Sequence, residues 1–156
     1  MPDTAKGFTL VELIGVIVIA GILAAVAAPR FFNAATFSSR GYFDGASGFL
    51  RYAQKLAIAR HGNVAVLVHA GDVPDVSGLT LCGVTTSPCP LASQIPGPDG
   101  NTPYQALVTN GVSLAGSVAN FSFNSQGSPG LTDITLTITG DTVRPLTVEA
   151  ETGYVH

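Results

Sequence analysis

Charged side chains are scarce in this chain. Only 11% of its 156 residues are Asp, Glu, Lys or Arg, whereas 46% are hydrophobic. Soluble domains usually carry about 25% charged residues, so an unusually apolar segment must shift the average. Residues 13–28 contain no charged side chain at all. The sequence therefore predicts one ordinary domain joined to an apolar anchor.

Basic side chains are rarer still in the second half of the chain. From Gly62 to His156 the only Lys or Arg is Arg144, against seven Asp and Glu residues, which leaves a net charge of −6 before the histidines are counted. A surface that binds nucleic acid needs clustered Lys and Arg to displace counterions. We therefore expect no nucleic-acid partner for residues 62–156.

Sequence motifs of catalysis are also missing. His61, His69 and His156 lie in no nucleophile motif, and the sequence contains no Gly-x-Ser-x-Gly, no phosphate-binding loop and no His-Glu-x-x-His. Asp72 and Asp75 are better interpreted as solvated turn residues than as a calcium site. We expect no catalytic residue, no metal and no cofactor, so the chain is predicted not to be an enzyme.

Cysteine is nearly absent, with Cys82 and Cys89 as the two examples. Gly, Ser and Pro in the intervening loop make it easy to bend, and a disulfide forms if this part of the chain reaches an oxidising compartment. Two free thiols, or half of a metal site, are the alternatives. No second pair of suitably spaced ligands accompanies them, which favours the disulfide.

One long apolar run is present at the start of the chain. Residues 8–28 number 21 and would span about 30 Å as a helix, the thickness of a membrane's hydrocarbon core. A secretory signal has a shorter apolar core and a more basic start than residues 1–7, which are basic only at Lys6. The run predicts a membrane-spanning helix, with a buried core helix as the alternative.

Glu12 interrupts this apolar run. A carboxylate deep in a bilayer costs about 2.5–3.5 kcal/mol on insertion scales, and a position near one end of the run lowers that cost without abolishing it. Such a residue usually has a partner or a function. The alternative is a side chain that reaches the lipid headgroups.

Residues 6–13, Lys-Gly-Phe-Thr-Leu-Val-Glu-Leu, resemble the type III signal of type IV prepilins and type II secretion pseudopilins. In that family a membrane peptidase cleaves after the glycine and methylates the new N-terminus. The resemblance implies a leader at residues 1–7, cleavage between Gly7 and Phe8, and N-methylation of Phe8. The chain would thus be the substrate of a prepilin peptidase and N-methyltransferase.

The same resemblance implies assembly roles for three residues. Glu12 would pair with the N-terminal amine of a neighbouring subunit and so set the register of assembly. Gly21 and Pro29 would bound a segment that unwinds in the filament, with a static kink at Pro29 as the alternative. The implied partners are other pilins or pseudopilins, the inner-membrane assembly platform and the lipid bilayer.

Localisation follows from the resemblance, because charge does not decide it. Lys6 precedes the apolar run while Arg30 and Arg40 follow it. The positive-inside rule therefore weakly favours a cytoplasmic C-terminal domain, opposite to the orientation that the resemblance implies. The family places such chains in the bacterial inner membrane as single-pass proteins. Their C-terminal domain is periplasmic before they enter a pilus or pseudopilus.

The remaining pattern predicts an α+β pilin fold, with a long N-terminal helix packed on a mainly antiparallel sheet. Residues 29–61 continue the helix amphipathically, with Gly62 as its C-cap. Its apolar stripe is Phe43, Ala46, Leu50, Ala53 and Ala57. Residues 62–156 form a β-rich domain. Its predicted strands are residues 63–70, 79–82, 118–123 and 134–139 and a last hairpin of 145–149 with 154–155, with residues 83–103 irregular.

Motifs in the second half rank the members of the family. The segments FSFNSQGSPG, TDITLTITG and TGYVH are similar to those of H-type pseudopilins and of minor prepilins of the mannose-sensitive haemagglutinin (MSHA) pilus. The run PRFFN after the apolar helix favours the MshC-like type. The resemblance implies a minor subunit of a type IV pilus, with an H-type minor pseudopilin as the alternative. The acidic end EAETGYVH does not carry over the DNA binding of related minor pilins.

Overall fold

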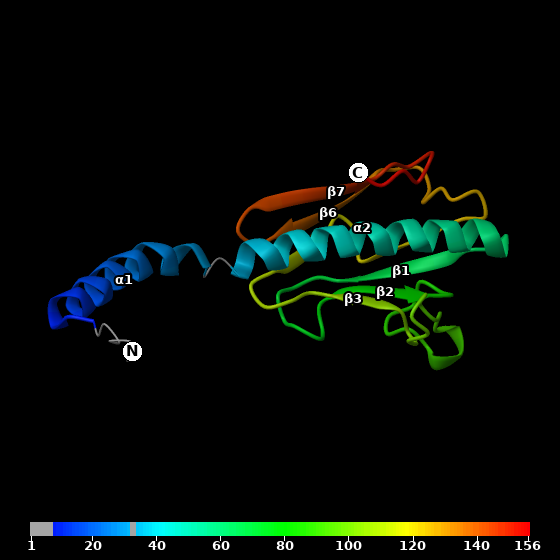
Figure 1. Ribbon diagram of the computed structural model, residues 1–156. Helices are drawn as coiled ribbons and strands as arrows, with labels where there is room; N and C mark the ends of the chain where they lie inside the picture. Colours follow the sequence, from blue (N-terminus) through cyan, green and yellow to red (C-terminus); the bar gives the residue numbers. More distant parts are fainter. Residues whose placement is uncertain (1–7, 32–33) are drawn as a thin grey trace, which may run out of the picture. The chain divides into compact units, whose positions relative to one another are not determined.

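Two compact units make up the chain, and Figure 1 shows the ribbon of each. The computed structural model describes the backbone of residues 8–31 and 34–156 and the side chains of residues 8–25 and 37–156. The N-terminal unit is Met1–Ala34 and the globular unit is Ala35–His156. The elements are α1 (Leu10–Phe31), α2 (Ala34–Arg60), β1 (Val64–His69), β2 (Gly78–Cys82), the 3-10 helix η1 (Leu91–Ser93), β3 (Gln105–Leu107), β4 (Ser113–Gly116), β5 (Asn120–Phe123), β6 (Ile134–Thr139) and β7 (Val143–Val148).

The helical half of the chain is described as two helices. The sequence predicts one helix over residues 8–61, whereas the structure has α1 and α2, with residues 32–33 outside the described part. Continuity between the helices therefore stays a prediction. No helix in the part of the chain that the structure describes is both long enough and apolar enough to cross a membrane. The side chains of residues 26–28, at the end of the predicted span, lie outside that part.

Helix α2 buries one stripe and exposes the other. The predicted stripe residues Ala46, Leu50, Ala53 and Ala57 are fully buried, and Phe43 packs on the same core. The spacing of three and four residues places these side chains on one face of the helix. The basic residues of the helix, Arg40, Arg51, Lys55 and Arg60, are exposed. The sequence pattern thus set which face of α2 points inward.

Tyr42 is a core residue that the stripe did not include. It is 6% exposed, and its hydroxyl donates a hydrogen bond of 3.2 Å to the carbonyl oxygen of Ala106 on β3. Burial raises the pKa of Tyr42, because the charged phenolate loses its hydration there. A polar tip on an aromatic body lets this residue join the core while its hydroxyl stays paired.

Seven strands form two antiparallel sheets in the described residues, and the α+β class predicted from the sequence is confirmed. One sheet has the order β3-β2-β1-β5 and the other has the order β4-β6-β7. The sequence predicts a single sheet and misses β3 and β4, which are only three and four residues long. Strand β6 covers the predicted residues 134–139. Its first five residues alternate between buried and half-buried, and Thr139 at its end is exposed. Figure 1 shows α2 running along the strands of both sheets.

A single main core joins α2 to both sheets. Its members include Phe49 and Leu50 from α2, Leu81 and Phe123 from the four-stranded sheet, and Leu136 from the three-stranded sheet. The Phe49 ring stacks on Tyr104 with centroids 4.9 Å apart. Packing one helix on two sheets buries the apolar face of each element at once.

The C-terminal residues Val155 and His156 contact both the three-stranded sheet and α2. Val155 bridges Val148, and backbone hydrogen bonds join Thr147 to His156 in both directions at 2.7 and 3.0 Å. Arg51 on α2 donates a hydrogen bond of 3.2 Å to the Val155 carbonyl. The predicted last hairpin is present in this form, and it covers the edge of β7 that would otherwise be open.

Helix α2 ends on a left-handed residue, but that residue is not the predicted glycine. His61 has φ 50°, and its amide bonds the Ile58 carbonyl at 3.2 Å. The Gly62 amide bonds the Ala57 carbonyl, also at 3.2 Å. This pair of bonds is a Schellman motif. The prediction of Gly62 as the C-cap is therefore wrong by one residue, since His61 takes the left-handed position.

Replacing His61 by glycine should stabilise the globular unit. A side chain in the left-handed region costs about 1–2 kcal/mol, part of which is offset by the greater freedom of glycine in the unfolded chain. We expect His61→Gly to raise the free energy of unfolding by about 0.5–1 kcal/mol, measured by urea denaturation. Arg60→Gly, one residue earlier in the helix, is the control and should lower it. Equal or lower stability of His61→Gly would contradict the assignment of His61 as the strained residue at the helix end.

Candidate functional site

The candidate site is the start of α1, where the sequence predicts cleavage and assembly. Phe8 is 81% exposed and precedes the helix, which begins at Leu10. Gly7, the other residue of the predicted cleavage site, lies outside the described residues. Phe8 is therefore positioned at the helix entrance with its ring in solvent.

Thr9 caps this helix. Its side-chain Oγ1 accepts a hydrogen bond of 3.3 Å from the amide of Glu12, and its carbonyl accepts one of 3.1 Å from Leu13. A threonine followed three residues later by a glutamate is the capping-box pattern. Thr9 was not among the residues predicted from the sequence, although this pattern was available to find it.

Glu12 lies in the first turn of α1 and is exposed. A carboxylate at this end of a helix is favoured by the helix dipole, whose N-terminus is positive. Its backbone amide is already satisfied by Thr9. The Glu12 carboxylate makes no hydrogen bond or ion pair with any residue in the described ranges 8–25 and 37–156.

Among the described side chains of residues 8–25, α1 has no buried face within its own unit. Every large hydrophobic residue described between Phe8 and Leu23 is 48–81% exposed. A helix that is apolar on all sides is normally buried in a larger protein or in a membrane. The described part of α1 is therefore an apolar helix whose large side chains are exposed.

Gly21 and Pro29 both lie within α1, so the helix includes the two residues predicted to bound an unwinding segment. A Cβ atom added at Gly21 would meet no atom within 4 Å. The side chain of Pro29 is outside the described part. Unwinding on assembly and a static kink at Pro29 both remain predictions.

Cys82 and Cys89 form a disulfide in the structure, with their Cα atoms 5.9 Å apart. Cys82 ends β2 and is fully buried with Ala65 and Leu67 of β1, and Cys89 packs against this group. These residues lie on the face of the four-stranded sheet that is opposite the main core. The bond thus pins the irregular segment that follows β2 over the outer face of that sheet.

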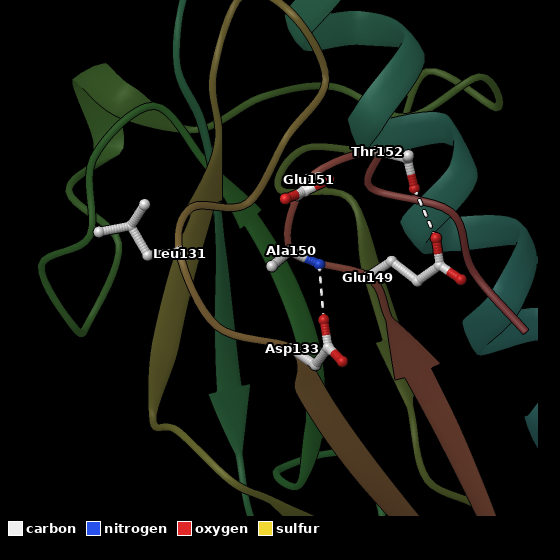
Figure 2. Close-up of a pocket in the computed structure, with 6 residues that line it drawn as sticks. All are labelled: Leu131, Asp133, Glu149, Ala150, Glu151 and Thr152. Carbon is white, nitrogen blue, oxygen red and sulfur yellow. Dashed lines mark hydrogen bonds between the residues drawn. The ribbon is translucent and has the colours of Figure 1, made fainter.

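A shallow hollow on the globular unit is lined by three acidic residues (Figure 2). It measures about 350 Å³ and is lined by Leu131, Asp133, Glu149, Ala150, Glu151 and Thr152. Asp133 accepts a hydrogen bond of 2.8 Å from the Ala150 amide, and Glu149 accepts one of 2.8 Å from the Thr152 hydroxyl. These bonds fix the turn after β7 and give two of the three carboxylates a structural role.

Histidine and acidic side chains in the described part of the chain do not gather into a ligand set. Among the described residues, no group of three or more His, Cys, Asp or Glu is arranged to hold a metal ion. His61 is exposed at the end of α2. The Nδ1 atom of His156 lies 3.9 Å from the Oε1 atom of Glu149.

Comparisons with known proteins point to the same segment. Residues 3–28 match the family model for the prokaryotic N-terminal methylation motif. Over 53 residues the chain is 45% identical to the type IV narrow pilus major component PilA5 of Thermus thermophilus. That match covers 34% of this chain and 46% of PilA5, so the chain spans about half the length of this curated relative.

Similarity to solved structures extends over most of the chain. Two crystal structures of the type IV minor pilin FimU from Pseudomonas aeruginosa align with TM-scores of 0.55 and 0.53, at 18% and 17% sequence identity. Each alignment covers 75% of this chain, and they cover 90% and 85% of the FimU chains. At this identity the similarity establishes the fold.

Removing the disulfide should destabilise the globular unit. The bond closes a short loop with a sequence separation of 7, for which loop-closure entropy gives about 2–3 kcal/mol. We expect Cys82→Ser/Cys89→Ser to lower the free energy of unfolding by that amount in urea denaturation of the purified chain. Thr85→Ala, an exposed change in the same loop, is the control and should leave the midpoint unchanged. An unchanged midpoint for the double variant would contradict the structural role of the bond.

Proposed function

We propose that this chain, which is a type IV pilin-like protein, is a filament subunit that is cleaved between Gly7 and Phe8 and assembled through its N-terminal helix. The methylation motif over residues 3–28 and the pilin fold support the proposal. Cleavage at this position would remove the seven-residue leader and leave α1 on the mature chain. Phe8 would then be the N-methylated first residue.

The exposure of α1 carries the proposal. Its apolar side chains have no partner within the described residues of its unit, and apolar surface of this extent is stabilised by about 25 cal/mol per Å² when it leaves water. A bilayer supplies that environment before assembly, and neighbouring copies of α1 supply it afterwards. The helix is thus suited first to hold the chain in the inner membrane and then to form the core of a filament.

Glu12 gives that apolar rod a specific register. Trimming creates a new amine at Phe8, one helical turn before the carboxylate of Glu12. Opposite charges attract strongly where little water screens them, and an unpaired buried carboxylate is costly. A bundle in which Glu12 of one subunit meets the amine of the next is therefore favoured over a shifted bundle. Thr9 assists by holding the first turn in place.

A finer assignment is a minor subunit of an MSHA-type pilus. The FSFNSQGSPG, TDITLTITG and TGYVH segments of the globular unit support it. The globular unit would then lie in the periplasm, where the disulfide of Cys82 and Cys89 forms, before the subunit enters the pilus. The partners would be other pilins, a prepilin peptidase and the inner-membrane assembly platform.

An H-type minor pseudopilin of a type II secretion system is the second candidate, and the same segments of the globular unit favour it. Such a subunit would share the trimmed helix and differ in its neighbours. Genes for pilus biogenesis beside this one would favour the pilus, and genes for secretion would favour the pseudopilus.

Loss of Glu12 should impair assembly without impairing trimming. We expect Glu12→Ala to lower incorporation into sheared filaments by at least about tenfold, because one charge of a buried pair is removed. The measurement is the ratio of chain in filaments to chain in membranes. Mass spectrometry of both fractions should show a mature chain beginning at methylated Phe8.

The control for this variant is Asp44→Ala, which removes an exposed carboxylate from α2. It should assemble at the wild-type level. Normal trimming together with unchanged incorporation of Glu12→Ala would refute the role of Glu12. A wild-type chain that still begins at Met1 in cells would refute the proposed function itself.

A further inference from the structure

A hollow of about 370 Å³ lies on the outer face of the four-stranded sheet, opposite the main core. Side chains of three neighbouring strands line this outer-face hollow, namely His69 on β1, Thr80 on β2 and Gln105 on β3. Thr80 is directly opposite Gln105 in the register of β2 and β3. It shares its face of β2 with Cys82, which packs outside the main core. The cleavage and assembly proposed for α1 leave this hollow without a role.

Three loops complete the walls of the outer-face hollow. The segment after β2 contributes Pro88 and Cys89, the segment after β1 contributes Val76, and Pro103 precedes β3. The disulfide ties Cys89 back to β2, and the ring of a proline fixes its φ angle. Walls of this kind are pre-organised, which lowers the entropic cost of binding a ligand.

Four accessible side chains of the outer-face hollow have hydrogen-bonding groups to offer. His69 and Gln94 are half-buried, and Asp75 and Gln105 are exposed. The Gln105 amide is oriented by the buried Thr80, because its Nε2 atom donates a hydrogen bond of 3.1 Å to the Thr80 Oγ1 atom. Apart from that bond, these four side chains make no hydrogen bond or ion pair with the part of the chain that the structure describes.

The chemistry of the lining selects an uncharged ligand that is rich in hydroxyl groups. Among the described residues that line the hollow, Asp75 is the one carboxylate, and residues 62–143 contain no Lys or Arg. An anionic ligand is therefore disfavoured. Amide, imidazole and carboxylate groups bind hydroxyls, while Pro88 and Pro103 offer apolar surface. A sugar ring matches both, since it has hydroxyls along its edge and C–H groups on its faces.

We infer that the outer-face hollow binds an uncharged sugar ring. Gln105, His69 and Asp75 hydrogen-bond its hydroxyl groups, and the two prolines contact its C–H face. A volume of about 370 Å³ lies within the range of about 300–1,000 Å³ that is usual for ligand pockets. The inference goes beyond the proposed filament function and does not depend on it, because the hollow contains no residue of α1.

Saturation-transfer difference NMR on the full-length chain tests the inference. The chain is held in dodecylphosphocholine micelles, because this detergent has no sugar headgroup. It is titrated with methyl β-glucoside, methyl β-galactoside and N-acetylglucosamine. At least one sugar should show saturable transfer with a Kd on the order of 1 mM, the affinity expected for a ligand of this size. Glycerol, which has hydroxyl groups but no ring, is the control and should show none. Absence of saturable transfer from all three sugars well above that Kd would overturn the inference.

Gln105→Leu locates the binding in the outer-face hollow. Loss of the amide should weaken binding by about fivefold to tenfold, and the melting temperature should not change because Gln105 is exposed on an edge strand. Thr80→Val keeps the shape of the side chain but releases the Gln105 amide, so it should also weaken binding. Gln126→Leu, at an exposed glutamine after β5, and Thr137→Val, on β6, are the matched controls and should bind normally. Unchanged affinity of Gln105→Leu would overturn the assignment of this hollow.

Sodium glucuronate tests the preference for an uncharged ligand, because it adds a carboxylate to the same ring. It should bind about threefold more weakly than methyl β-glucoside, since Asp75 repels it. Asp75→Asn should remove most of this difference, and asparagine tolerates the positive φ of 63° at this position. Glucuronate that binds the wild-type chain as tightly as the glucoside would contradict the inferred ligand class.

Discussion

The need of α1 for an apolar environment is the constraint on which the rest of the molecule depends. Its large side chains are exposed around the whole helix within the described residues, and a helix of this kind is not expected to persist alone in water. The globular unit has the opposite property, because α2 and two sheets enclose a core of their own. The globular unit thus buries its apolar side chains in its own core, whereas α1 needs an apolar environment from outside the chain to bury its side chains.

This division explains how single polar residues can decide the way in which apolar surfaces pack together. Within α1, Thr9 and Glu12 organise the first turn, and a lone carboxylate in apolar surroundings selects among otherwise equivalent ways of packing the rod. In the globular unit, Arg51 holds the C-terminal segment and the disulfide holds the segment after β2. These contacts add position and direction to burial that is itself non-directional.

Much of this organisation was predictable from the sequence. The period of three and four residues found the buried side of α2, and strict alternation found β6. Tyr42 was missed because an aromatic residue with a polar tip falls outside an apolar stripe. Strands β3 and β4 are too short to show a period, and the division into two sheets depends on pairing between distant residues. At the site, the motif identified Phe8 and Glu12. The Thr9 cap was missed, although the capping-box pattern of Thr9 and Glu12 is present in the sequence.

The most direct test of this division is the association state of the globular unit alone. A chain of residues 35–156 lacks α1 and retains the complete core. We predict a monomer at micromolar concentration by analytical ultracentrifugation, with the disulfide intact and one cooperative unfolding transition. An unfolded chain, or an assembly as large as that of the full-length protein, would contradict the claim that α1 is the unit that must find its burial outside its own chain.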